Sequence, residues 1–359
     1  MKLSAQKILV MRYRFIGDTV LTVPFLRNLR QAFPQARIDL MLEPFSGQVI
    51  EGCPYVDRII PFEIRTIHRY SNRSERGKLA GYLQYWKQIR QERYDAAFVL
   101  KRSLSSALLV WAAGVPRRIG FITEGRRLLL TDPVPYQQDR HEVQNFLDCL
   151  RALDIPVSSD DLELWPSRAG DEKIRSLFRE AGWRQEDLKI VIHTAASLPA
   201  KQWPLERFAG VMKRLGQRYR PRFIYTGAKG DSTLYEELER MGPFNGLNLC
   251  GVTSLRENLS AYRASNLFFG VDSGPMHMAA AIGVPVVALF GPTDERKWGP
   301  WGKGHTVITK RLACRPCKPH KCGIHECMDR ISVEDALAAV EAKLEALLVQ
   351  PAGFSQPSI

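Results

Sequence analysis

The stretch V-D-S-G-P-M-H-M-A-A-A-I-G-V-P-V-V-A-L-F-G-P-T, which runs from Val271 to Thr293, decides the fold. It follows the segment 266–271, which predicts a short buried strand, and D-S-G then supplies a tight turn. Pro275 suits the first turn of a helix, where its missing N–H costs nothing, and Gly283 suits the position just past the helix end. The apolar run 284–290 is typical of a strand that is buried on both faces of a parallel sheet. The stretch therefore predicts a strand–turn–helix–strand unit with a right-handed crossover.

The turn in this stretch has the chemistry of an anion site. The free N–H groups of Ser273, Gly274 and the first helical residues point out of the carboxyl end of the strand, and the helix dipole adds to their attraction for a phosphate or diphosphate. Asp272 is suited to accept hydrogen bonds from turn N–H groups or from a sugar hydroxyl, and His277 lies on the first helical turn. The same residues also fit an ordinary βαβ unit with a capping aspartate and a core histidine.

A second unit of the same kind opens the chain. A strand at 7–11 leads into a loop that ends at Asp18, and a helix at 19–33 is followed by a strand at 37–42. Asp18 lies where the loop meets the helix, at the carboxyl end of the first strand. It suits two roles that can coexist: an N-cap, and a general base that faces a cleft and is kept ionised by the helix N-terminus.

Between and after these units the pattern is two α/β series. The pattern lapses at 166–171 (P-S-R-A-G-D), where we place the linker. The second series opens with a strand at 189–193, followed by the loop T-A-A-S-L-P-A-K-Q-W-P. Each series offers loops at strand carboxyl ends, where open α/β sheets bind ligands. The last helix, predicted at 333–348, is a candidate to pack back on the first domain. The predicted parts are a first domain at 1–168, a second domain at 169–350 and a flexible tail at 351–359.

The composition indicates an anionic partner. The 359 residues include 51 Lys and Arg against 38 Asp and Glu, for a formal charge of +13. This charge suits nucleic acid, a phosphorylated substrate or an acidic membrane surface. The basic stretch 63–79 has no helical or strand period, so it fits either a solvated loop or a loop that meets an anionic acceptor. No apolar run approaches the roughly 18 residues of a membrane span and no signal peptide is recognisable, so we expect a cytoplasmic protein that is at most peripheral to the membrane.

Several enzyme classes are disfavoured by missing motifs. No G-x-G-x-x-G follows the first strand and no G-x-x-x-x-G-K-[ST] occurs, which argues against a dinucleotide dehydrogenase and a P-loop NTPase. No D-x-D occurs, which weakens a metal-chelating sugar-nucleotide site. A carboxylate in the first half and a diphosphate site in the second remain. Lys201, in K-Q-W-P, is a candidate cation for the diphosphate or a solvated lysine. A sugar-nucleotide transferase needs this combination: a base for the acceptor hydroxyl, and N–H dipoles or positive charge on the departing diphosphate.

These motifs resemble those of the lipopolysaccharide heptosyltransferases, glycosyltransferase family 9. The similarity lies in I-L-V-M-R-x-x-x-I-G-D-T-V-L-T-V-P at the N-terminus, in K-Q-W-P, and in the long D-S-G-P-M-H-M-A-A-A-I-G-V-P-V-V-A-L-F-G signature. The resemblance implies the α/β GT-B fold, in which two Rossmann-like domains face each other across a cleft. The first domain would bind the acceptor and the second the nucleotide sugar.

The resemblance also implies a reaction. It is an inverting, metal-independent transfer of heptose from ADP-L-glycero-D-manno-heptose to the phosphorylated inner core of lipopolysaccharide, at the cytoplasmic face of the membrane, with no cofactor and no nucleic-acid partner. Asp18 falls on the catalytic base. The implied donor-binding residues are Thr194, Ser197, Lys201, Asp272, Ser273, Gly274 and His277, and our candidates for the acceptor are Arg65, Arg102 and Arg118.

The sequence departs from the family pattern in one loop. Ala195 and Ala196 stand where relatives often carry hydroxyl residues, which leaves Thr194 and Ser197 to supply them. Phe15 and W-G-P-W at 298–301 are more similar to the heptosyltransferase III branch than to branches I and II. Two alternatives stay open: a GT-B enzyme that uses another nucleotide sugar, and a basic nucleic-acid-binding protein with a metal site in its cysteine cluster.

That cluster holds four of the seven cysteines. It reads Cys314-x2-Cys317-x4-Cys322-x4-Cys327, with two histidines between them. Four close thiols can bind zinc, although paired structural zinc sites more often show two C-x-x-C knuckles. The alternative is a surface loop with reduced thiols.

Overall fold

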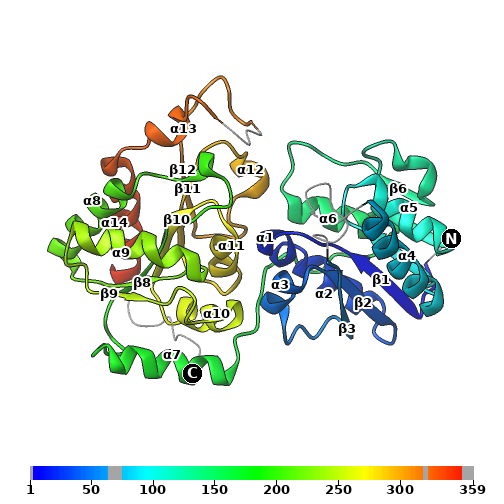
Figure 1. Ribbon diagram of the computed structural model, residues 1–359, viewed down its shortest axis with the longest axis horizontal. Coiled ribbons are helices and arrows are strands. Elements are labelled where there is room, and N and C mark those ends of the chain that lie inside the picture. The colour runs from blue at the N-terminus through cyan, green and yellow to red at the C-terminus, as the bar shows by residue number, and fades with distance from the viewer. Residues whose placement is uncertain (1–2, 64–74, 318–321, 350–359) are drawn as a thin grey trace. The chain divides into compact units, whose positions relative to one another are not determined.

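The computed structural model describes residues 3–63, 75–317 and 322–349, and the chain divides into two compact units. The first is Met1–Leu162 and the second is Glu163–Ile359 (Figure 1, blue to cyan and green to red). The division falls a few residues before the break at 166–171 that the sequence suggested as the linker, because helix α7 (Arg168–Glu180) already packs on α10 (Leu255–Arg263) in the second unit.

The first unit is built on a six-stranded sheet in the order β3-β2-β1-β4-β5-β6. All of its strand pairs are parallel; Ile8, for example, lies beside Ile38 on one side and Ala96 on the other. The chain winds outward from β1 through β2 to β3, then returns to the other side of β1 for β4. The order therefore reverses between β1 and β4. The strands are β1 (Lys7–Met11), β2 (Arg37–Leu42), β3 (Arg58–Pro61), β4 (Ala96–Val99), β5 (Arg117–Phe121) and β6 (Asp132–Val134).

The predicted helix at 19–33 is wrong in one respect, because it is two helices. A short α1 (Ile16–Val20) ends before α2 (Val23–Ala32), which has Pro24 in its first turn. Proline cannot donate to the preceding turn, and its ring clashes with the carbonyl four residues back, so one helix cannot run through this point. The N-cap of α1 is Phe15, and Asp18 lies inside the helix instead of capping it. The other helices of this unit are α3 (Pro44–Gly47), α4 (Glu75–Glu92), α5 (Leu104–Ala112) and α6 (Glu142–Arg151).

The second unit repeats the plan with the strand order β12-β11-β10-β7-β8-β9. Again every pair is parallel, and the order reverses between β7 and β10, where Phe269 lies beside Ile192. The strands are β7 (Lys189–His193), β8 (Arg222–Tyr225), β9 (Gly246–Asn248), β10 (Leu267–Val271), β11 (Val286–Phe290) and β12 (Thr306–Thr309). The sequence did not predict β6 and β12, which are short edge strands without a fully apolar run.

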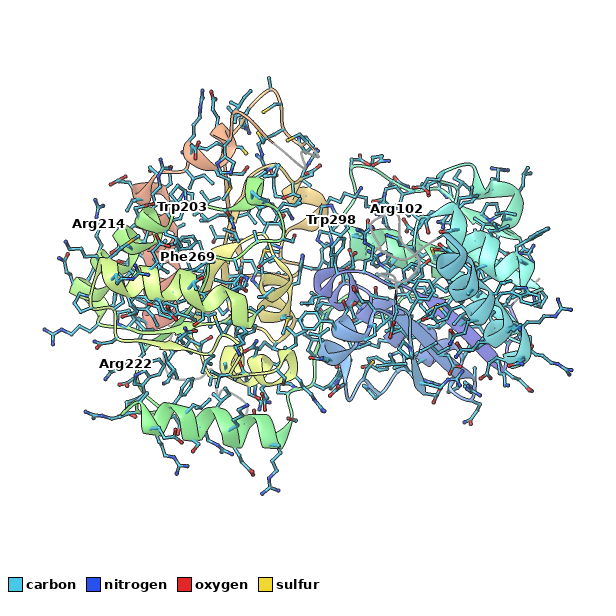
Figure 2. The ribbon with its side chains drawn as sticks, viewed as in Figure 1. Arg102, Trp203, Arg214, Arg222, Phe269 and Trp298 are labelled. Atoms are coloured by element: carbon cyan, nitrogen blue, oxygen red, sulfur yellow. The ribbon has the colours of Figure 1, made fainter. Side chains whose placement is uncertain are left out.

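Two groups of helices cover this sheet (Figure 1). One group joins α8 (Leu205–Tyr219), α9 (Ser232–Met241) and the last helix α14 (Val333–Val349); the other joins α7, α10 and α11 (Gly274–Ala281). Trp203 and Phe269 lie in the core, whereas Arg214 projects from the surface (Figure 2). Val340 of α14 belongs to the same core. The last helix therefore helps to build the core of the second unit, and its packing on the first domain stays a prediction.

The predicted fold class, α/β with two Rossmann-like units, is confirmed. Each unit is an open parallel sheet with crossover helices and one reversal of strand order. Ligands of such sheets bind outside the carboxyl ends of the strands at the reversal. The loops after β1 and β4, and those after β7 and β10, are therefore the places to look for function. No helix in the described part of the chain is both long and apolar enough to cross a membrane.

Candidate active site

Asp18 lies at the strand-order reversal of the first unit, in a buried ion pair. Its carboxylate Oδ1 is 2.5 Å from Nη2 of Arg12, the residue that directly follows β1. Both side chains are less than a tenth exposed, and the Arg12 guanidinium also stacks over the ring of Phe146 at 5.1 Å. Burial raises the pKa of Asp18, the charge of Arg12 opposes that shift, and the nearby carboxylate of Glu142 adds to it. Asp18 is thus a carboxylate made more basic by its surroundings, as a general base requires.

Positive charge gathers around Asp18 from the loop after β4. The amino group of Lys101 interacts electrostatically with Asp18, Arg12 and Arg102, and burial together with the neighbouring arginines lowers its pKa to about 8. Arg102 stacks over the ring of Tyr136 at 4.1 Å (Arg102 is labelled in Figure 2). A cationic wall beside a basic carboxylate suits an acceptor that carries phosphate or carboxylate groups.

Buried polar side chains hold this loop in place. Arg126 is completely buried, and it donates hydrogen bonds to the carbonyls of Phe121 and Lys101. Tyr136 donates to Oε2 of the buried Glu142 at 2.7 Å, at the start of α6. Arg102 therefore stacks on the ring of Tyr136, whose orientation is fixed by its hydrogen bond to Glu142.

The structure separates the three predicted acceptor arginines. Arg102 lies close enough to Asp18 to lower the pKa of that carboxyl. Arg118 instead lies near the amino end of β5, whereas Asp18 lies beyond the carboxyl end of β1. The Arg118 guanidinium donates to the carbonyls of Leu129 and Val115. Arg65 lies outside the described residues. Of the described pair, only Arg102 is brought to Asp18.

Asp272 lies at the strand-order reversal of the second unit. It follows β10, is 5 % exposed, and pairs through Oδ2 with Nζ of Lys201 at 2.7 Å. The Thr293 hydroxyl donates to the same oxygen. Lys201 belongs to the 3₁₀ helix η4 (Pro199–Lys201) in the loop after β7. The sequence suggested turn N–H groups or a sugar hydroxyl as donors to Asp272; the structure shows that side chains of two other loops bind it.

The other predicted donor residues divide by exposure. Ser273 caps α11 in extended conformation, and its Oγ is buried without a hydrogen-bond partner among the described residues. A buried hydroxyl left in that state points to a ligand or water that completes it. Gly274 begins the helix, and His277 is buried within it. Thr194 is buried at the end of β7 near Tyr235, whereas Ser197 is exposed. Lys201 is paired with Asp272, and Ser273 and Gly274 directly follow Asp272 in the chain. These four residues therefore lie together at the strand-order reversal of the second unit.

Comparison with known proteins identifies the family. The model of glycosyltransferase family 9 (heptosyltransferase) matches residues 82–327, about two thirds of the chain. The chain belongs to glycosyltransferase family 9. The matched span contains Lys201 and Asp272 and begins after Asp18.

Named relatives extend over most of the chain. Lipopolysaccharide heptosyltransferase 2 of Escherichia coli K12 is 29% identical over 354 residues, covering 96% of this chain and 99% of that protein. Lipopolysaccharide heptosyltransferase 3 of the same strain is 28% identical over 299 residues, covering 80% and 83%. The solved structure of E. coli ADP-heptose lps heptosyltransferase II has a TM-score of 0.76 at 25% identity, covering 95% of this chain and 99% of that one. These identities do not separate the branches, so the resemblance to branch III stays a prediction.

Sequence reasoning missed several residues of this glycosyltransferase site. Arg12, Lys101 and Thr293 each lie in a loop that follows an internal strand of a sheet, so strand ends were the signal that could have found them. Glu142 and Tyr136 had no such signal, because their place beside Arg102 and Asp18 comes from tertiary packing alone.

The four C-terminal cysteines are free thiols. Cys314 and Cys322 are exposed, Cys317 is half-buried and Cys327 is buried. Within residues 3–63, 75–317 and 322–349 no group of three or more His, Cys, Asp or Glu is arranged to hold a metal ion. The described part of the family 9 chain therefore gives no support to the zinc interpretation of this cluster.

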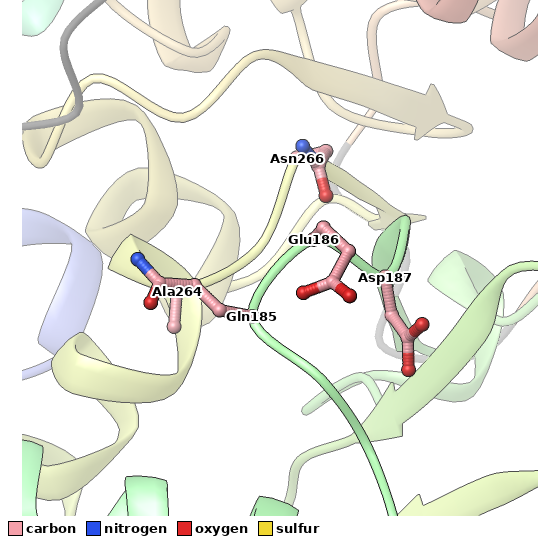
Figure 3. Close-up of a pocket in the computed structure, with 5 residues that line it drawn as sticks. All are labelled: Gln185, Glu186, Asp187, Ala264 and Asn266. Carbon is pink, nitrogen blue, oxygen red and sulfur yellow. The ribbon is translucent and has the colours of Figure 1, made fainter.

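A pocket of about 450 Å³ lies elsewhere, at the amino ends of β7 and β10 (Figure 3). Its polar groups already serve the fold, because Asn266 Oδ1 accepts from the N–H of Lys189 at 2.8 Å and Asp187 accepts from Arg222 at 3.1 Å. Open parallel sheets bind their ligands at the carboxyl ends of the strands. The pocket lies at the amino ends, so it is separate from the site described above. It is lined by Gln185, Glu186, Asp187, Ala264 and Asn266.

Proposed function

We propose that this family 9 glycosyltransferase transfers heptose from ADP-L-glycero-D-manno-heptose to the phosphorylated inner core of lipopolysaccharide, with inversion at the anomeric carbon. The observation that carries the proposal is the pair of buried carboxylates at the two strand-order reversals, one basic and one bound to a lysine. The near full-length similarity to lipopolysaccharide heptosyltransferase 2 supports the choice of donor and acceptor.

In the first unit, Asp18 accepts the proton of the acceptor hydroxyl as that oxygen attacks the anomeric carbon. The raised pKa of Asp18 favours this transfer. Lys101 and Arg102 lie where they can bind anionic groups of the acceptor, and so bring its hydroxyl to Asp18. Arg12 keeps the carboxylate oriented by its ion pair.

In the second unit, the chain's own groups oppose the charge of the leaving ADP. The bond between the anomeric carbon and the diphosphate oxygen breaks as the new glycosidic bond forms, and negative charge builds on the diphosphate. We expect Lys201 and the N–H groups at the start of α11 to stabilise this charge, which the pairing of Lys201 with Asp272 at that strand end supports. Asp272 holds Lys201 at this position, and the Ser273 hydroxyl has hydrogen-bonding capacity left for the ligand.

The acceptor also suggests the place of action. Lipopolysaccharide precursors are membrane glycolipids, so the enzyme would work as a peripheral protein on the cytoplasmic face of the inner membrane. The formal charge of +13 supports attraction to such an anionic surface. No metal or other cofactor is part of the proposed mechanism.

The test is ADP release from ADP-heptose with heptose-deficient lipopolysaccharide, compared between the wild type and Asp18→Ala. We expect acceptor-dependent ADP release by the wild type and its loss in the variant, with ADP binding retained. Turnover with a UDP- or GDP-sugar and none with ADP-heptose would replace the proposed donor. Turnover that survives in Asp18→Ala would move the base to another residue.

A further inference from the structure

Arg315 is a nearly buried arginine for which no motif predicted a role. Only 7 % of its side chain is exposed. Its guanidinium pairs with the Glu295 carboxylate at 2.9 Å and donates to the carbonyl of Thr293 at 3.0 Å and that of Lys310 at 3.1 Å. Its Nε donates to the carbonyl of Gly291. One side chain therefore binds four groups, which is more than a surface ion pair needs.

The contacts of Arg315 converge on the loop 291–293, which directly follows β11. Arg315 donates to the carbonyls of Gly291 and Thr293. The carbonyl of Pro292, which lies between them in the chain, accepts from the N–H of Cys317 at 2.8 Å. Three successive carbonyls of the loop thus accept hydrogen bonds from the short segment 315–317. The loop is also tightly packed, because a Cβ on Gly291 would lie 2.6 Å from the sulfur of Met328 and 3.2 Å from the Ala200 carbonyl oxygen.

This loop carries a side chain into the donor site. The Thr293 hydroxyl donates to the Asp272 oxygen that also pairs with Lys201. A chain of contacts therefore runs from Arg315 through the backbone and hydroxyl of Thr293 to Asp272 and on to the lysine. A shift of the loop would withdraw one of the two donors that orient this carboxylate.

We propose that Arg315 is a positioning residue of the donor site: it fixes the loop 291–293 so that Thr293 and Lys201 together orient Asp272. The choice of ADP as the ligand of this site rests on the proposed function. An arginine is required because its planar fork presents five N–H donors at fixed angles, whereas a lysine ammonium is a point charge with three donors. Lysine at 315 can keep the pair with Glu295, but it cannot serve the three carbonyls at once.

The test is calorimetric titration of the full chain with ADP, which needs no turnover. Arg315→Lys should raise the Kd for ADP about fivefold, in the range set by loss of one or two hydrogen bonds. The matched control is Arg207→Lys. Arg207 also donates to two backbone carbonyls of the second unit, those of Asp329 and Ile331, but has no bond to the loop 291–293. Its substitution should change the Kd by less than about twofold.

A second pair of variants tests the route through Thr293. Thr293→Val should raise the Kd roughly tenfold, because it removes a hydrogen bond to a charged group, whereas Thr293→Ser keeps the hydroxyl and should restore binding to within about twofold of the wild type. In the Thr293→Val background, Arg315→Lys should add less than about twofold, since coupled residues are not additive.

Three results would overturn the inference: equal effects of Arg315→Lys and Arg207→Lys, an undiminished Arg315→Lys effect in the Thr293→Val background, or unchanged ADP binding in Thr293→Val. Each leaves the proposed function standing as long as the wild type binds ADP. Absence of ADP binding by the wild type would overturn the proposed function and the inference with it. Thermal unfolding of each variant confirms that the protein titrated is folded.

Discussion

Asp18 and Asp272 both lie at the strand-order reversal of their units, yet they follow different strands and their surroundings differ. Asp18 follows β1, the first strand of its unit, whereas Asp272 follows β10, the counterpart of β4. Each follows a central strand at a strand-order reversal, each is buried, and each pairs with one cation. The cation of Asp18 is Arg12, from the loop between β1 and α1, and a second carboxylate, Glu142, lies near enough to raise the pKa of Asp18. The partners of Asp272, Lys201 and Thr293, come from two other loops.

The difference suggests a division of labour between two similar folds. A carboxylate whose pKa is raised by burial and by a neighbouring acid is prepared to accept a proton. A carboxylate bound by a lysine and a hydroxyl from separate loops is prepared to hold those loops together. We therefore expect the strand-order reversal to serve proton transfer in the first unit and ligand binding in the second, because different strands and loops carry the two carboxylates.

The largest expected effect comes from Asp18→Asn, which removes the base and keeps the shape. We expect kcat to fall about 10³-fold, within the range for loss of general-base catalysis, while the Kd for ADP stays within about twofold of the wild-type value. Steady-state kinetics and calorimetry measure the two quantities. Loss of ADP binding in Asp18→Asn would contradict the assignment of proton transfer to Asp18 and of ADP binding to the site of Asp272.

The converse change, Asp272→Asn, should act on binding. It leaves Lys201 without its charged partner, and removing one member of a buried pair typically costs at least about 2 kcal/mol, so the Kd for ADP should rise roughly 30-fold. At saturating donor, kcat should fall far less than in Asp18→Asn. A large loss of kcat with unchanged ADP affinity would contradict the assignment.

These two carboxylates also show how far the sequence leads. The apolar runs and turn residues predicted both sheets and placed Asp18 and Asp272 at strand carboxyl ends, because parallel strands and their turns are encoded locally. The residue pattern offered Lys201 as a candidate cation for the diphosphate, and the family resemblance placed it among the donor-binding residues. The break between α1 and α2 was also visible in principle, since Pro24 marks it.

The pairings around these carboxylates were not predictable from the sequence. Arg12 is separated from Tyr136 and Glu142 by more than a hundred residues of chain, and it comes near them only when the loop after β1 packs against α6 in the first unit. The position of Arg118 was not predictable either: its place in a basic motif suggested an acceptor contact, whereas the strand register puts it near the amino end of β5. Whether a residue lies at the amino or the carboxyl end of a strand depends on where that strand begins, and the boundaries of short strands are poorly predicted from the sequence.

A pH profile sharpens the comparison on the side of Asp18. Lys101 carries its charge below its pKa of about 8 and loses it above, so binding of an anionic acceptor should weaken as the pH rises through 8. We expect KM for the acceptor to increase by up to about tenfold per pH unit above 8, and Lys101→Arg to abolish that increase because arginine stays charged. A KM that is flat from pH 7 to 9.5 in the wild type would contradict this role.

The smallest effect concerns the acidic side of the same profile. Asp18 must be ionised to act as a base, so kcat should fall as the pH drops through its raised pKa. Arg12 lowers that pKa by its charge, and Arg12→Gln should therefore move the acidic fall of kcat to higher pH. The position of the fall is read from kcat between pH 4.5 and 7.5. A shift to lower pH in the variant would show that Arg12 does not stabilise the ionised form.

A single-turnover measurement at saturating ADP-heptose, with Asp18→Asn and Asp272→Asn side by side, tests the central claim most directly. Saturation compensates for weak binding and leaves the chemical step exposed. The account predicts transfer by Asp272→Asn within about tenfold of the wild-type rate and transfer by Asp18→Asn at least about a hundredfold slower. Equal losses in the two variants, or near wild-type transfer by Asp18→Asn, would contradict it.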